Sequence, residues 1–210
     1  MARSSAQEPL APSRRPRVAG DRESDILDAT VEVLAEVGYD RLTMDSVAAA
    51  AHASKATLYR RWSSKGELVV DAVARAKRLP DNETPDTGSL REDLLSRSCG
   101  SHGWTGSLPM AVLAGLITAL QTDEDLAKAW RRTVLVPAQD ATRELFERAQ
   151  QRGDIPPNAN LELLVALLPA MCTYRCFVAG RPVDEDFVRA VIDDVVLPAA
   201  RRTCSSRAGR

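Results

Sequence analysis

The sequence of 210 residues is poor in the side chains that most often build catalytic and metal centres. It holds two histidines and four cysteines, and no two cysteines form a Cys-x-x-Cys pair. The spacing does not support a tetrahedral metal site, so we expect neither a metal nor a cofactor. Sparse, unpaired cysteines are typical of a reducing compartment, and we therefore expect a cytoplasmic protein.

An excess of one charge sign is also lacking, since 28 Lys and Arg face 29 Asp and Glu. A near-neutral total argues against a general coat for nucleic acid or membranes, but it leaves a local basic patch open. The first nineteen residues lack the apolar run of a secretory signal. The most apolar segment, 161–179, is interrupted by Glu162, Pro169 and Arg175, which favours a buried helix over a membrane span.

Strand-like alternation is absent, and the apolar spacing predicts an all-α protein. We expect helices at about 21–37, 44–51, 54–61, 64–78, 89–98, 107–120, 122–150, 160–179 and 184–197. Thr43, Ser54 and Asn160 are expected N-caps, and Ser64–Glu67 and Ser89–Glu92 are expected capping boxes. Gly38, Gly153 and Gly180 should end helices, and Pro137 should kink or break one.

Composition divides the chain into four parts. Residues 1–19 are rich in Ser, Pro, Ala and Arg and should be a disordered arm, for which an inert tail is favoured over DNA contacts by Arg14, Arg15 and Arg17. Residues 20–66 should form an N-terminal three-helix helix-turn-helix domain. Residues 67–200 should form a C-terminal helical domain for ligand binding and dimerisation, and 201–210 a disordered tail.

Residues 43–62 (TMDSVAAAAHASKATLYRRW) concentrate positive charge on a helical hairpin. The segment from His52 to Lys65 contains four Lys or Arg residues and no acidic one. A helix fits the major groove, and its cations neutralise phosphates. The helix starts at Thr43, Ser54 and Ser64 can offer backbone N–H groups to phosphate oxygens. A solvated basic face is the alternative interpretation of this surface.

The segment 26–68 resembles the DNA-binding domain of the TetR family over nearly its full length, in ILDATVEVLAEVGYDRLTM, SVAAAA, SKATLYRRW and SSKGELV. The resemblance implies base contacts from Lys55, Ala56 and Arg60. It implies phosphate contacts from Thr57, Tyr59, Arg61, Thr43 and Lys65. One departure is His52, where the family usually has glycine in the turn; a surface turn residue is favoured there over a pH sensor.

The rest of the chain is similar to the ligand-binding domain of many TetR-type regulators, through DEDLAKAW, ATRELFERAQQRGDIPP and GRPVDEDFVRAVIDDVV. The resemblance implies a homodimer through helices at about 160–180 and 184–199. The apolar character of 161–179 nearly all round independently favours burial by a two-fold partner, with a central core helix as the alternative.

A ligand cavity between the middle helices is the default form of such a site, although core packing is the simpler role for each residue alone. The candidate lining residues are Trp104, Met110, Leu113, Leu116, Trp130, Phe146, Met171, Tyr174 and Phe177. Tyr174 and Arg175 could be its polar handles. Cys172 and Cys176 lie four residues apart, and buried packing is favoured over redox sensing or a soft metal.

Together these features predict a dimeric, sequence-specific DNA-binding regulator. It would be a repressor that an apolar or amphipathic small molecule releases from a palindromic operator. A helical small-molecule-binding protein without a DNA role is the alternative. We expect no enzyme, because no Ser/His/Asp set, phosphate loop or metal spacing is found, and paired acids such as Asp193 and Asp194 are typical of solvated helix faces.

Overall fold

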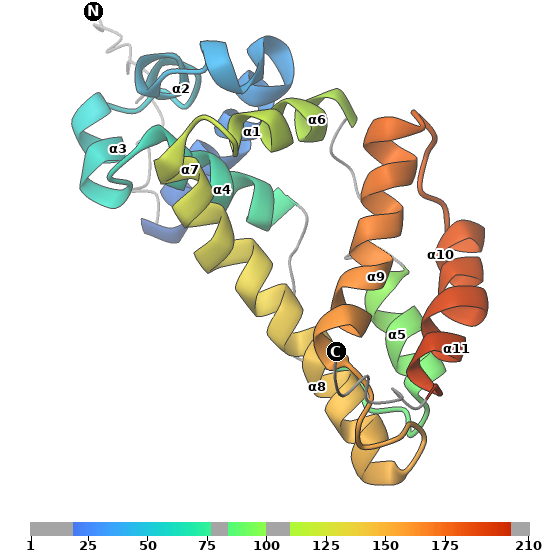
Figure 1. The fold of residues 1–210 in the computed structure, drawn as a ribbon. Helices are drawn as coiled ribbons and strands as arrows, with labels where there is room; N and C mark the ends of the chain where they lie inside the picture. Colours follow the sequence, from blue (N-terminus) through green and yellow to red (C-terminus); the bar gives the residue numbers. More distant parts are fainter. Residues whose placement is uncertain (1–18, 77–83, 100–109, 203–210) are drawn as a thin grey trace, which may run out of the picture.

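The computed structural model describes residues 19–76, 84–99 and 110–202, and all of the regular elements in these ranges are helical (Figure 1). Most of the expected N-terminal arm and C-terminal tail, and the loop that carries Trp104, lie outside the described residues. The α-helices are α1 (Ala19–Arg41), α2 (Met44–Ala50), α3 (Lys55–Arg61), α4 (Lys65–Ala76), α5 (Leu90–Ser98), α6 (Met110–Ala119), α7 (Glu124–Trp130), α8 (Val136–Arg152), α9 (Leu161–Thr173), α10 (Glu185–Val191) and α11 (Leu197–Ala200). Three π-helical turns are η1 (Arg131–Leu135), η2 (Tyr174–Val178) and η3 (Ile192–Val196).

Most of the expected helix ends are confirmed. Thr43, Ser54 and Asn160 accept hydrogen bonds from backbone N–H groups of their first helical turns. Gly153 and Gly180 follow α8 and η2 with positive φ angles of 81° and 61°. At Gly38 the backbone is non-helical (φ 76°, ψ 166°), so the expected end appears as a kink within α1, which continues to Arg41.

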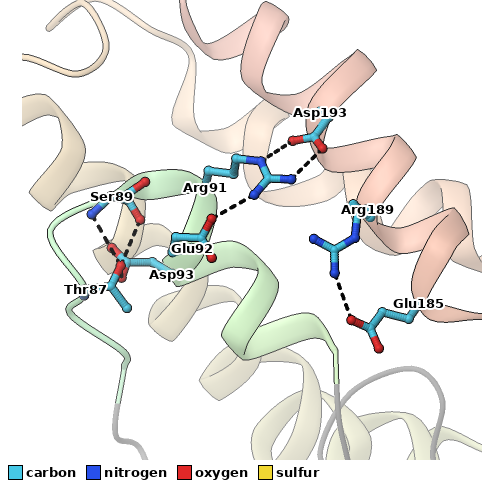
Figure 2. Close-up of polar contacts among 8 residues, drawn as sticks. All are labelled: Thr87, Ser89, Arg91, Glu92, Asp93, Glu185, Arg189 and Asp193. Carbon is cyan, nitrogen blue, oxygen red and sulfur yellow. Dashed lines mark hydrogen bonds and ion pairs between the residues drawn. The ribbon is translucent and has the colours of Figure 1, made fainter.

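Two expected capping boxes differ from the structure. Ser64 caps Glu67, but the Glu67 carboxylate accepts from the N–H and hydroxyl of Ser63 instead of returning to Ser64. The Ser89 side chain makes no cap bond, so that box is wrong. The Ser89 N–H donates instead to the Thr87 hydroxyl at 3.3 Å, and the Glu92 carboxylate accepts from Arg91 at 2.7 Å (Figure 2).

The chain does not break at Pro137. The π-helical turn η1 lies immediately before it and joins α7 to α8 as one continuous helical path. Proline lacks the N–H that would bond to the preceding turn, and a wider turn is one way to accommodate that loss. The turn η3 stands in the same relation to Pro198.

Buried side chains form two separate cores. The first is built by α1–α4 with α6 and α7, and the second by α5 and α8–α11. The path α7–η1–α8 runs from one group of helices to the other (Figure 1). Because Leu116 of α6 and Leu126 of α7 belong to the first core, the division between cores does not coincide with the domain boundary expected at 66/67.

Candidate DNA interface

The helices α2 and α3 form the helix-turn-helix, held by a small set of buried side chains. Met44, Val47 and Ala48 of α2 face the first core, as do Leu58 of α3 and Trp62 just beyond it. The Trp62 indole N–H donates to Asp71 of α4 at 2.8 Å. Burial of a single side of α3 leaves its other side free for a partner.

The turn between these helices has the conformation that the family's glycine would favour. His52 has a φ of 49° and is the only non-glycine residue with a positive φ in the described ranges. Its carbonyl accepts a hydrogen bond from the Arg22 guanidinium of α1, and the N–H of Ala53 returns to the carbonyl of Ala48 at 2.8 Å. The departure at His52 therefore keeps the turn geometry, at the cost of a less favoured backbone conformation.

The exposed side of α3 brings most of the expected DNA contacts together. Lys55, Ala56, Tyr59, Arg60 and Arg61 are all exposed. The Tyr59 ring keeps 49% of its surface accessible, and the Lys55 ammonium lies 5.9 Å from the ring centroid.

Thr57 and Ser54 are committed to the start of α3. Thr57 is half-buried, and its N–H donates to the Ser54 hydroxyl at 3.1 Å. The Thr57 and Ser54 hydroxyl oxygens lie 2.8 Å apart.

Two of the α3 cations already have carboxylate partners. Lys55 contacts Asp45 of α2 at 2.9 Å. Arg61 contacts Glu23 of α1 through two nitrogens, at 3.1 and 3.3 Å. Hydrogen bonding to these carboxylates raises the pKa of Lys55 and the pKa of Arg61. No carboxylate of the described residues lies within 4 Å of Arg60.

The remaining two expected contacts, Thr43 and Lys65, lie at the starts of α2 and α4. The Thr43 hydroxyl accepts from the N–H of Ser46 at 3.1 Å, and the Thr43 N–H donates to the Ser46 hydroxyl. Lys65 is half-buried: its ammonium donates to the Tyr39 carbonyl at 3.1 Å and lies 4.2 Å from the Tyr39 ring centroid.

A contact between α4 and α7 ties the helix-turn-helix to the rest of the chain. A Cβ on Gly66 would lie 2.7 Å from the Leu126 backbone nitrogen, so only glycine permits this approach. Beside it, Tyr39 donates to Asp123 at 2.5 Å and Arg132 of η1 contacts Glu67 at 3.0 Å. These partners are 60 to 84 residues apart in sequence, and no short motif indicates them.

The candidate ligand-lining residues are not brought together by the described part of the chain. Leu116 and Trp130 pack in or against the first core, and Phe146 and Phe177 in or against the second. Met171 and Tyr174 are exposed on the α9–η2 surface. The side chains of Met110 and Leu113, both on α6, are not described, and Trp104 lies outside the described ranges.

The polar residues singled out on α9 and η2 serve the local structure. Arg175 donates to the Pro182 carbonyl at 2.6 Å, contacts Asp184 and stacks on the Phe187 ring at 4.2 Å. Cys172 and Cys176 are buried, and burial raises the pKa of Cys172 to about 12. A protonated, buried thiol fits a packing role better than a sensing role.

Comparison with known proteins identifies both halves of the chain. Residues 26–72 match the model of bacterial regulatory proteins of the tetR family, and residues 84–195 match a tetracyclin repressor-like C-terminal domain. The chain belongs to the TetR family. This membership confirms the all-helical fold with an N-terminal helix-turn-helix, and the expected DNA-binding transcriptional regulator.

TetR-family relatives match over most of their length. A DNA-binding transcriptional repressor TetR of Mycobacteroides abscessus is 37% identical, over 86% of this chain and 94% of the relative. The regulator YdeS of Bacillus subtilis is 32% identical, over 85% and 89%. The crystal structure of the TetR-family regulator SCO0332 is 30% identical with a TM-score of 0.60, and the match covers 84% of this chain and 97% of that one. Salmonella enterica GusR shares the fold at 18% identity, with a TM-score of 0.63 over 88% of this chain and 100% of its own.

Proposed function

We propose that this TetR-family protein is a cytoplasmic repressor that binds a palindromic operator as a homodimer and is released by a small apolar or amphipathic ligand. The observation that carries the DNA-binding part is the exposed side of α3, where Lys55, Tyr59 and Arg60 stand clear of the first core. Lys55, Ala56 and Arg60 would read bases in the major groove. Thr57, Tyr59 and Arg61 would contact phosphates, with Thr43, Ser54 and Lys65 at the helix starts.

An exposed apolar stripe on α9 and η2 supports the dimer. Leu163, Met171, Tyr174 and Val178 are all exposed and recur at helical spacing. The segment Leu161–Val178 is long and apolar enough to cross a membrane by composition, yet only 28% of it is buried within one chain. A second copy, related by a two-fold axis, would cover this surface together with α10–η3–α11. Two recognition helices about 34 Å apart would then match successive major grooves.

Effector release follows from the way the long helical path joins the two cores. A ligand that binds one arrangement of the second half more tightly would shift the population toward it. The contacts of α7 and η1 with α4, at Gly66 and Glu67, would carry that shift to the helix-turn-helix. Of the lining residues expected from the sequence, Phe146 and Phe177 lie in or against the second core and are the candidates for a ligand site in that half.

Fluorescence anisotropy with the protein's own promoter tests the DNA-binding role. We expect specific, salt-sensitive binding, and a loss of about 1–3 kcal/mol for Arg60→Ala or Lys55→Ala if each reads a base. Arg131→Ala, an exposed arginine of η1, is the control and should bind as the wild type. Normal operator binding by both α3 variants would show that α3 is not the reading helix.

A further inference from the structure

Two arginines on α5 have opposite electrostatic surroundings. Arg91 is paired with carboxylates on both sides: it contacts Asp193 of η3 through two nitrogens at 2.7 and 2.8 Å, and Glu92 at 2.7 Å (Figure 2). Arg97, in the last turn of the same helix, is half-buried. Within the ranges that the structure describes, no carboxylate lies within 4 Å of the Arg97 guanidinium, and the charge of Glu144 on α8 acts on it only at longer range.

The two acceptors that Arg97 contacts also have other hydrogen-bond donors. Its Nε donates to the Thr142 hydroxyl at 3.2 Å and its Nη2 to the Ala138 carbonyl at 3.3 Å. The Thr142 hydroxyl already donates to the Ala138 carbonyl at 2.8 Å. That carbonyl also faces the backbone N–H four residues later in α8. Removing Arg97 would therefore leave neither group unsatisfied.

The position is costly for a charged group. Desolvation lowers the pKa of Arg97, although a guanidinium stays charged at neutral pH. The negative end of the α5 dipole compensates part of the charge. Buried charges in proteins are otherwise paired, and an unpaired one lowers stability. Charges kept without a partner are typical of places where a ligand supplies it.

The two acceptors of Arg97 lie where the helical path passes between the cores. Ala138 and Thr142 belong to the first turns of α8, just after η1. Leu135 and Val136, three and two residues before Ala138, are exposed apolar side chains. The adjoining turn of the same helical path thus offers apolar side chains to the body of a ligand whose anionic group contacts Arg97.

We propose that Arg97 recognises the carboxylate of the effector, so that the ligand class is an amphipathic organic acid. This rests on the proposal that the second half of the chain binds a small molecule. The carboxylate would take up the guanidinium N–H groups in a two-pronged contact, as carboxylates do with arginine. Since the hydrogen bonds of Arg97 join α5 to the first turns of α8, just after η1, the bound acid would act on the path that leads to α4.

The test compares matched acids and neutral molecules on the full-length protein. Decanoate and benzoate are titrated beside decanol and benzyl alcohol against the wild type, Arg97→Met and Arg97→Lys, with thermal midpoint and calorimetric Kd as readouts. We expect at least one acid to bind and its Kd to weaken about tenfold or more in Arg97→Met, as for loss of a charged hydrogen bond. Arg97→Lys should retain part of the preference for the acid, and the neutral molecules should not distinguish the variants. Binding of decanoate would indicate an effector with an acyl chain, and binding of benzoate would indicate an effector with an aromatic ring.

A second readout separates recognition from a structural role. Without ligand, Arg97→Met should melt at or above the wild-type temperature, because it removes an unpaired charge and orphans no acceptor. Arg91→Met, which strands Asp193, is the matched variant and should melt lower. Failure of both acids to bind, equal acid binding by Arg97→Met and wild type, or a ligand-free midpoint as low as that of Arg91→Met would each overturn the proposal. Operator binding is also measured for the wild type and Arg97→Met without ligand. If both bind the operator specifically and equally while the acids fail to bind, the proposed acid site is wrong and the proposed DNA-binding function stands.

Discussion

The carboxylates that hold Lys55 and Arg61 place a limit on how strongly α3 attracts DNA. Each pair is exposed to solvent, so its own contribution to the stability of the fold is small. Phosphates must nevertheless compete with Asp45 and Glu23 for the same nitrogens. A sequence-specific protein benefits from this competition, because cations that bind any phosphate raise non-specific binding first.

Glu23→Gln and Asp45→Asn should each tighten binding to a random duplex by about two- to fivefold at low salt, in line with the free energy of an exposed pair. Anisotropy titrations between roughly 50 and 200 mM salt, over which phosphate contacts weaken strongly, would measure this change in affinity. Glu36→Gln, an exposed carboxylate on α1 without such a pair, is the control and should change little. If Glu23→Gln has the same effect in an Arg61→Gln background, general charge removal explains the result and the pair does not.

Gly66 is a residue at which one added carbon has a large effect. Gly66→Ala would force a Cβ within 2.8 Å of two backbone atoms of Leu126, which cannot rotate away. Overpacking of this kind costs about 1–3 kcal/mol, and here it would also push α4 from α7. Gly115→Ala, in α6 with open space around its Cα, is the matched control and should stabilise by roughly 0.5–1 kcal/mol. Chemical denaturation of both variants measures their free energies of unfolding. Equal stability of Gly66→Ala and the wild type would show that α4 and α7 have room for a Cβ at this position.

At the scale of helices, local chemistry was predictable and long-range chemistry was not. The caps at Thr43, Ser54 and Asn160 follow from sequence because an N-cap bond spans only three residues. The Ser89 box failed because the Ser89 N–H and the Glu92 carboxylate have other partners, the Thr87 hydroxyl and Arg91. The pairing of Glu23 with Arg61 joins residues 38 apart and depends on how α1 crosses α3, which periodicity alone does not give.

The start of α7 illustrates an element whose stability should depend on pH. Asp123 accepts from the Leu126 N–H at 2.9 Å and from the Tyr39 hydroxyl. Desolvation alone would raise the pKa of Asp123, but these two donors stabilise the carboxylate more, so its pKa lies below the ordinary value. The same burial and the Asp123 charge strongly raise the pKa of Tyr39.

Asp123→Ala should therefore lower the free energy of unfolding at pH 7 by about 1–2 kcal/mol, through loss of the cap and of the tyrosine's partner. A carboxylate whose pKa is lower in the folded state stabilises the fold fully at a pH above its unfolded-state pKa of about 3.9. That contribution is lost as the pH falls through its folded-state pKa. The gap between variant and wild type should thus close below about pH 4. Urea denaturation from neutral to acid pH measures it. Tyr39→Phe, which keeps the cap, should lose less, and a gap that stays constant into acid would contradict the assignment.

At the scale of the whole molecule, the two cores leave one large apolar surface without a partner. Leu163 is 57% exposed and Val178 is 71% exposed, at opposite ends of the stripe on α9 and η2. Contiguous exposed apolar surface of this kind marks an interface in a protein that works in water. In the proposed dimer the long path α7–η1–α8 would join the first core to the core that carries the interface.

Leu163→Glu together with Val178→Glu should separate the dimer into 22.8 kDa monomers while leaving each monomer folded. Within one chain both positions face solvent, so the substitutions should change its stability by no more than about 0.5 kcal/mol. In the dimer they would bury unpaired charges, at a cost of several kcal/mol per ion. Light scattering after gel filtration measures the mass, and fluorescence anisotropy measures the operator affinity. The affinity should fall for the full palindrome and not for an isolated half-site, because only the palindrome engages two linked helix-turn-helix units. Ala35→Glu, an exposed change on α1, is the control for added charge. A double variant that keeps the dimer mass and full operator affinity would place the interface elsewhere, and the stripe would then need another partner.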